Sequence, residues 1–331
     1  MSSTLEYSPP QTRTPARRAL LPAQLGPLIG LVIVTTLFTI LRFNSFASVS
    51  NVQVMLTQTV VVGAAALGMT LVIISGGIDL SVASCIALSC VVVAKLLKIG
   101  APPITTVFAG IVVGGVAGTL IGIIVTQLRL APFIVTLGTW GAYRGVAKGV
   151  ANESTIDPDP TWINDLLTLP SGSHRWMLVP PGVWTVLVLA LLMGAVLRYT
   201  RFGRHVFAIG SNEQTARLCG ISITRTKILL YMVAGLFAGL AGVFQFSYLG
   251  VGDPTTAAGM ELDIIAAVVI GGASLSGGQG TILGTLVGAM LMTVVANGCN
   301  KLGMRNWVQE VVTGVIIILA AAIDRLRQSS R

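Results

Sequence analysis

Long apolar runs separated by short polar intervals dominate the chain. We predict ten membrane-spanning helices, at residues 25–42, 54–74, 78–97, 104–127, 132–149, 183–198, 228–249, 263–275, 280–299 and 308–323. Backbone groups in lipid must be hydrogen-bonded within the segment, so such runs form helices. The eighth run, at ~1.5 Å per residue, covers only ~20 Å of a ~30 Å bilayer core. We therefore expect it to be tilted into the protein or to belong to a broken helix.

The composition supports an all-α, polytopic membrane bundle. Of 331 residues, 53% are hydrophobic and 10% are charged, and 38 are glycine, which excludes an ordinary soluble domain. The four cysteines show no CxxC spacing, so we predict neither a metal site nor a disulfide. A cleavable signal peptide is the alternative for the first run, since Ser45 and Ala47 form a small-x-small pattern. Its apolar core is longer than such signals require.

The polar intervals divide the chain. We expect a disordered cytoplasmic tail at 1–22, a single membrane domain at 23–325 and a cytoplasmic tail at 326–331. Within the domain, 151–181 is predicted to be an external loop and 199–227 a basic cytoplasmic segment. With both termini inside, thirteen of the 21 Lys and Arg lie in the cytoplasm, which agrees with the positive-inside rule.

The basic segment between the sixth and seventh runs is predicted to carry a short helix. Ser211 is expected to cap it, with Gln214 completing a capping box, and Gly220 to end it in the left-handed conformation. A helix of about two turns is marginal in water unless it packs against something. We therefore expect a partner protein to dock here.

Two similar glycine-rich segments interrupt apolar runs and suggest an internal repeat of two halves. Gly76 and Gly77 align with Gly271 and Gly272 at an offset of 195, and the following polar residues align with them. Breaks at matching points of two halves are pointers to a transport path. The candidate path residues there are Ser75, Asp79, Ser81, Ser274 and Ser276. An alternative for Asp79 is a helix cap at the cytoplasmic boundary.

The fifth run mixes aromatic and hydroxyl side chains, and Thr136 and Trp140 are added to the candidate path. An aromatic ring can cover the apolar face of a sugar, although aromatic residues that only fill the core are commoner. Glycines recur at four-residue spacing in three runs and predict close helix packing there. They are Gly110, Gly114, Gly118 and Gly122, then Gly141, Gly145 and Gly149, then Gly280, Gly284 and Gly288.

The external regions carry most of the remaining acids. The loop 151–181 is acidic, and we hypothesise that it receives a soluble solute-binding protein; a solvated cap is the alternative. Asp253, Glu261 and Asp263 fall in the next external turn and are expected to cap helices or face water.

Several activities are disfavoured. No P-loop follows the glycine pairs, so the chain is not expected to be an enzyme that hydrolyses ATP, and no HExxH or GxSxG motif is present. An ion-coupled secondary transporter is the main rival, but it usually places ionisable residues deep in its spans. A passive channel is a further alternative, which the composition does not exclude. Neither rival explains the basic segment.

Four stretches together closely resemble the permease subunits of bacterial ribose-type, or monosaccharide, ABC importers, which depend on a binding protein. They are residues 67–82 (LGMTLVIISGGIDLSV), 132–138 (PFIVTLG), 209–221 (IGSNEQTARLCGI) and 261–278 (ELDIIAAVVIGGASLSGG). Within the third, Glu213, Ala216 and Gly220 match a glutamate-alanine-glycine coupling pattern. The ATPase-coupling residues expected from this match are Ser211, Asn212, Glu213, Ala216, Arg217 and Gly220.

The resemblance implies a location in the bacterial inner membrane and a set of partners. These are a second permease subunit, identical or sister, two cytoplasmic ATPase subunits that use ATP-Mg, and a periplasmic or tethered binding protein. No cofactor is expected on this chain. A monosaccharide such as ribose, galactose or xylose is the expected solute; inositol, a nucleoside, an autoinducer sugar or a branched-chain amino acid are alternatives.

Overall fold

A computed structural model of the protein describes residues 25–169 and 177–329, and over these residues it is helical with no β-strand. The expected tail at 1–22 lies outside the described residues. The helices are α1 Leu25–Leu41, α2 Phe43–Phe46, α3 Val49–Ile74, α4 Val82–Lys98, α5 Pro103–Gln127, α6 Pro132–Val150, η1 Asn164–Leu166, α7 Pro181–Tyr199, α8 Arg201–Ser211, α9 Glu213–Leu218, α10 Ile223–Leu249, α11 Met260–Ile270, α12 Ile282–Lys301 and α13 Asn306–Ser329. The all-α helical bundle predicted from the sequence is confirmed.

Each of the ten predicted spans contains one helix. By length and composition, α3, α5, α7, α10 and α12 are each able to cross a membrane, and shorter apolar helices cover Gly26–Leu41 and Trp307–Leu319. The eighth span is a broken helix, because α11 ends at Ile270 and an irregular segment follows until α12 begins. Helices α3 and α10 each start five residues before the predicted span.

The core of the bundle lies among α3, α4, α10, α11 and α12. Helix α3 is buried without interruption from Val60 to Ile74, so it is surrounded by protein along its inner half. Two hydrogen-bonded pairs join α3 to α12. Asn51 Nδ2 donates to Asn297 Oδ1 at 2.9 Å, and the hydroxyls of Thr70 and Thr285 lie 2.8 Å apart.

The glycine faces have two different outcomes. A Cβ on Gly114 or Gly118 of α5 would overlap the backbone of α10 at Gly235 or Tyr231. In the same way, a Cβ on Gly288 of α12 would overlap the Ala267 carbonyl of α11, and one on Gly284 would overlap the carbonyl of Gly271, directly after α11. Close packing is therefore confirmed for these faces.

The prediction fails for α6. A Cβ on Gly141, Gly145 or Gly149 would have no atom of the described chain within 4 Å. Helix α6 contacts α4 and α5, but its glycine face has no partner helix among the described residues.

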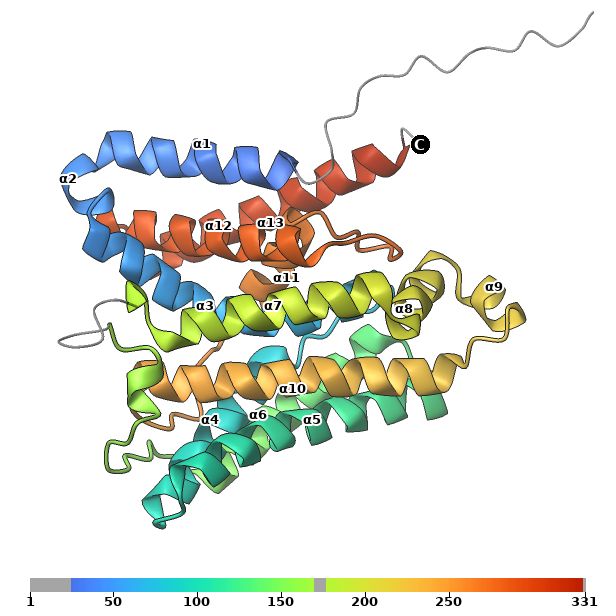
Figure 1. Ribbon diagram of the computed structural model, residues 1–331, viewed down its shortest axis with the longest axis horizontal. Helices are drawn as coiled ribbons and strands as arrows, with labels where there is room; N and C mark the ends of the chain where they lie inside the picture. Colours follow the sequence, from blue (N-terminus) through green and yellow to red (C-terminus); the bar gives the residue numbers. More distant parts are fainter. Residues whose placement is uncertain (1–24, 170–176, 330–331) are drawn as a thin grey trace, which may run out of the picture.

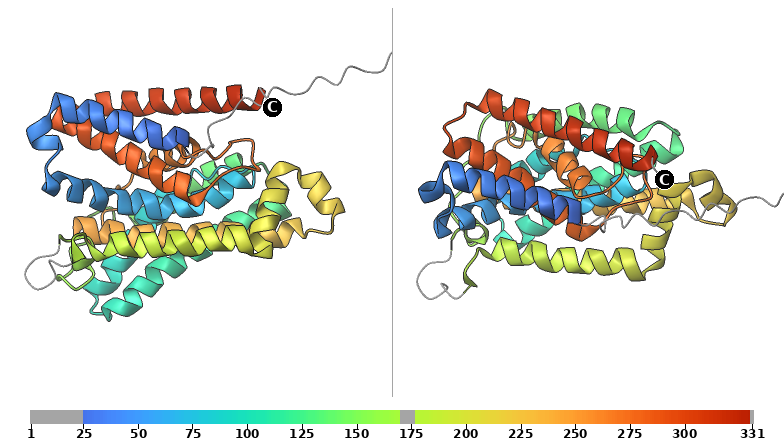
Figure 2. Two further views of the ribbon diagram at one scale, coloured as in Figure 1. Left: turned by 45° about the horizontal axis from the view of Figure 1, so that its top comes forward. Right: turned by 90° about the horizontal axis from the view of Figure 1, so that it is seen from above.

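The two ends of the bundle differ. Helices α8 and α9 project beyond the other helices, at the end where α1 starts and α13 finishes (Figures 1 and 2); we call this the α9 end. At the opposite end, the loop after α6 folds over the bundle. Ile156 and Gly252 form an isolated antiparallel bridge, and Ile163 is fully buried. The loop residues 170–176 lie outside the described residues.

Candidate functional site

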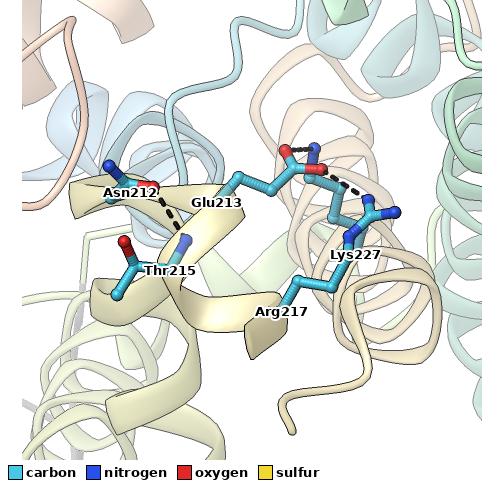
Figure 3. Close-up of polar contacts among 5 residues, drawn as sticks. All are labelled: Asn212, Glu213, Thr215, Arg217 and Lys227. Atoms are coloured by element: carbon cyan, nitrogen blue, oxygen red, sulfur yellow. Dashed lines mark hydrogen bonds and ion pairs between the residues drawn. The ribbon is translucent and has the colours of Figure 1, made fainter. Parts of the chain in front are cut away.

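The segment between α7 and α10 forms two helices, α8 and α9, that meet at Asn212. The Asn212 side chain accepts a hydrogen bond from the Thr215 amide at 2.9 Å, so Asn212 caps α9 (Figure 3). The expectation that Ser211 is the cap is wrong. Ser211 is the last residue of α8, and its hydroxyl donates back to the Phe207 carbonyl at 2.9 Å.

Helix α9 ends as predicted at Gly220, which has a φ of +81°. The Gly220 amide donates to the Arg217 carbonyl, and the Ile221 amide donates to the Ala216 carbonyl. These two bonds form a Schellman motif, which satisfies the last carbonyls of the helix and turns the chain toward α10.

Helix α9 is held in place by one ion-pair cluster and one buried side chain. Glu213 Oε2 lies 2.7 Å from Lys227 Nζ on α10, and Glu213 Oε1 lies 3.4 Å from Arg217 Nη2 (Figure 3). Ala216 is buried against Ile209 and Ile223. Glu213, Ala216 and Gly220 therefore all hold α9 against the chain's own helices.

Other side chains of α9 face outward. Gln214, Arg217 and Leu218 are exposed, and Leu218 exposes 88% of its surface. This leucine, at the tip of a projecting helix, is an apolar group that no part of the described chain covers. The sequence analysis did not identify Gln214 and Leu218 as surface residues. Their positions two residues before and after Ala216 place them on other sides of the short helix once Ala216 is taken as its buried residue.

The two glycine-rich segments have closely similar geometry. We call residues 74–81, which start at the last residue of α3, the first break, and residues 271–281 the second break. Each begins with a Schellman turn, in which Gly76 and Gly272 have φ values of +81° and +93°. The turns correspond at an offset of 196, one more than the sequence alignment gave, because Gly76 pairs with Gly272 and not with Gly271.

A side-chain turn follows in each break, here at the predicted offset of 195. In the first break, Asp79 Oδ1 accepts from the Ser81 amide at 2.8 Å and from the Ser81 hydroxyl at 2.6 Å. In the second, Ser274 Oγ accepts from the Ser276 amide at 3.3 Å. Asp79 lies just before α4 and is buried in the bundle, but it does not cap that helix, because the N-cap residue is Ser81 and Asp79 bonds only to Ser81 within the described chain.

The end of α8 lies directly against both breaks. The Gly278 amide donates to the Ile74 carbonyl at 2.8 Å. A Cβ on Gly210 would overlap that carbonyl and that amide, and a Cβ on Gly277 would lie 2.6 Å from the Gly210 carbonyl oxygen. We call this contact of Ile74, Gly210, Gly277 and Gly278 the Gly210 joint. It is the place where the segment that carries α9 touches both breaks.

The remaining candidate residues divide between these regions. Thr136 of α6 is buried and donates to the Ile78 carbonyl at 3.1 Å, so it supports the first break. Ser75 donates to the Val72 carbonyl. Trp140 is 40% exposed and makes no hydrogen bond to either break among the described residues.

One group near the first break was missed. The Tyr231 hydroxyl of α10 is buried with no hydrogen-bond partner among the described residues, and a Cβ on Gly77 would lie 2.7 Å from it. A buried tyrosine hydroxyl usually finds a partner. Tyr231 lies within an apolar run, and nothing in the sequence indicates that it lies beside Gly77, which is distant along the chain.

The family described as "branched-chain amino acid transport system / permease component" matches residues 51–321 of this chain. The ribose import permease protein of Escherichia coli (strain K12) is 39% identical over 301 residues, which are 91% of this chain and 93% of that protein. The ribose import permease protein of Bacillus subtilis (strain 168) is 38% identical over 306 residues, 92% of this chain and 94% of the relative.

A third relative, the L-arabinose ABC transporter permease protein of Azospirillum brasilense, is 33% identical over 304 residues, 92% of this chain and 88% of that protein. No solved structure is significantly similar to the chain.

Proposed function

The chain belongs to the family of branched-chain amino acid transport system permease components, and on that premise we propose that it is the membrane-spanning subunit of an ATP-driven monosaccharide importer. As a permease it is a multi-pass inner-membrane protein, which agrees with its apolar helices. The sugars named for its relatives support a monosaccharide as the solute. In this topology the α9 end is cytoplasmic, and so are both termini.

We infer that ATP is bound and hydrolysed by two partner ATPase subunits. The sequence has no phosphate-binding loop of its own. A second permease subunit completes the path, and an external binding protein delivers the solute. The acidic loop 151–181 is the proposed contact for that binding protein.

The observation that carries the proposal is the form of α9. It is a six-residue helix that projects from the bundle and is braced by Glu213, Ala216 and Gly220, while Gln214, Arg217 and Leu218 are left exposed. So short a helix is unstable alone. We propose that an ATPase groove covers its exposed side chains and moves it when ATP binds.

The Gly210 joint supplies the route for that movement. Only Asn212 separates α9 from α8, and the end of α8 contacts both breaks. Displacing α9 therefore displaces the inner ends of α3 and α12 together. Two arrangements of these helices, each favoured by different contacts, would open the path alternately to the two sides.

The test is uptake by proteoliposomes that contain the permease with its ATPases, with binding protein outside. We expect labelled ribose or arabinose to accumulate only when ATP reaches the ATPase side and binding protein is present. Accumulation by the permease alone, without nucleotide, would contradict the proposal. Uptake of leucine in place of any sugar would favour the branched-chain amino acid alternative that the family's description suggests.

A further inference from the structure

A cavity of about 240 Å³ lies among four core helices, α3, α10, α11 and α12. Small-molecule pockets are typically about 300–1,000 Å³, so this one suits a single small solute. It lies in the half of the bundle away from α9, since it is bounded by the end of α10, the first turn of α11 and the last turns of α12. None of the candidate path residues lines it.

The cavity is closed toward the α9 end. Its deepest α3 residue, Val62, is about 20 Å along the helix from Val49 at ~1.5 Å per residue. Below it, Leu67 and Leu71 are fully buried, and the Thr70–Thr285 hydrogen bond joins α3 to α12. The cavity is thus a pocket on the far side and not a continuous pore.

Polar groups with unused hydrogen-bonding capacity line this pocket. Asp263 and Gln58 make no hydrogen bond within the described chain. Gln245 donates its amide to Thr256 Oγ1 at 2.7 Å, which leaves its carbonyl oxygen available. Asn300 accepts from Gln309 through Oδ1, which leaves its amide hydrogens available. The wall therefore offers both donors and acceptors, and a sugar hydroxyl is at once a donor and an acceptor.

The charge of the lining selects among solutes. Among the described residues, Asp263 is the one charged group of the lining, and no Lys or Arg belongs to it. An anionic solute, such as a sugar phosphate or the carboxylate of an amino acid, would lie beside Asp263 without a cationic partner. The apolar wall of Val61, Val62 and Met292 suits the C–H face of a sugar ring.

We propose that this cavity is a binding site for a neutral, polyhydroxylated solute on the outward side of the permease, with Asp263, Gln58, Gln245 and Asn300 as its hydrogen-bonding groups. The inference rests on the proposed function, because that function makes the far side external. It corrects the expectation that Asp263 caps a helix or faces water, since its half-buried carboxylate lines the pocket.

The first test uses the complete importer in proteoliposomes with variants Asp263→Asn and Gln58→Met. Gln58→Met removes the hydrogen-bonding groups of the side chain, and Asp263→Asn replaces the charge and one acceptor oxygen by a donor amide, each with little change of size. We expect sugar uptake per ATP hydrolysed to fall about tenfold or more, since a polar solute is left unpaired in a dry site. ATP hydrolysis stimulated by loaded binding protein should persist, because the Gly210 joint is unchanged. Glu310→Gln, an exposed carboxylate on α13, is the matched control.

The outcomes separate the two proposals. If the wild type imports sugar and both variants keep its uptake per ATP, the cavity assignment is overturned and the function stands. If the wild type imports no sugar with every partner present, the proposed function fails. Import of an amino acid would overturn the polyol assignment even if Asp263 were needed.

A second measurement does not depend on transport. Ala296→Cys, made together with Cys219→Ser so that the exposed native thiol does not react, places a thiol on the cavity wall in the full importer. A membrane-impermeant maleimide should label it from outside, and millimolar ribose or arabinose should slow the labelling whereas leucine should not. Labelling only from the ATPase side, or equal slowing by leucine, would overturn the proposal.

Discussion

Glu213 is the residue that fixes the position of α9 against α10. Its carboxylate bridges Arg217 and Lys227, and the Lys227 side chain is only 17% exposed. The Glu213 side chain is 41% exposed, and an ion pair open to solvent in this way stabilises a protein by roughly 0–1 kcal/mol. The contribution of Glu213 is therefore to geometry more than to stability.

We predict that Glu213→Arg abolishes ATP-driven uptake while the thermal unfolding midpoint changes little. The new cation would face Lys227 and Arg217 and push α9 out of its seat. The measurement is uptake together with ATP hydrolysis in proteoliposomes. Adding Lys227→Glu restores an ion pair of reversed polarity and should recover part of the uptake. Wild-type uptake by Glu213→Arg would show that α9 is not the coupling element.

The residue that caps α9 could not be predicted from the sequence alone. Ser211 and Asn212 are adjacent and both are good caps, so local propensity cannot choose between them. The packing of α8 decides between them. Helix α8 extends to Ser211, because Gly210 fits closely against the backbone of Ile74 and Gly278. Gly220 was predictable, because few other residues tolerate its left-handed conformation.

At the scale of elements, glycine faces decide which helices lie closest. The same four-residue spacing occurs in α5, which packs tightly on α10, and in α6, whose glycines contact nothing in the part of the chain that the structure describes. The spacing makes a face flat, but the partner is set by tertiary structure. The sequence therefore predicts the face and not its occupant.

We predict opposite effects of the same substitution on these two helices. Gly118→Ala should destabilise the permease by about 1–3 kcal/mol, because the new methyl group overlaps the Tyr231 backbone. Gly141→Ala should change the stability by no more than about 1 kcal/mol, in the stabilising direction, through helix propensity. Thermal unfolding in detergent compares the two. Equal destabilisation would mean that α6 is covered in the isolated permease.

The Gly210 joint gives a second prediction for elements. In Gly210→Ala, the new methyl group meets the backbone of Ile74 and Gly278, which cannot rotate aside as a side chain can. We expect uptake to fall about tenfold or more, equivalent to ~1.4 kcal/mol or more, with basal ATP hydrolysis retained. Gly194→Ala on α7, where nothing lies within 4 Å, is the control. Normal uptake by Gly210→Ala would exclude the joint from coupling.

At the scale of the whole molecule, alternation of apolar and polar segments was sufficient to predict the ten main helices. Lipid leaves the backbone few alternatives, so hydropathy carries most of the fold. The cavity was not predictable in the same way. Its walls come from residues near 60, 246, 262 and 296, which only tertiary packing brings together.

The proposed orientation predicts a labelling pattern for the unmodified protein. Of its four cysteines, Cys85, Cys90 and Cys299 are buried and Cys219 is exposed after α9. An impermeant maleimide should therefore label wild-type vesicles only where the cytoplasmic face is outward. Cys219→Ser should abolish the label. Labelling from the external face would invert the topology.

The two polar pairs between α3 and α12 constrain how such a protein can move. They lie nineteen residues apart on α3, about 28 Å at ~1.5 Å per residue. Sliding one helix past the other would break both bonds where little water is available to replace them. We therefore expect α3 and α12 to tilt together as one rigid body. Because the joint contacts this pair at the α9 end, we expect a small displacement there to move the opposite end of the pair, which forms one wall of the cavity.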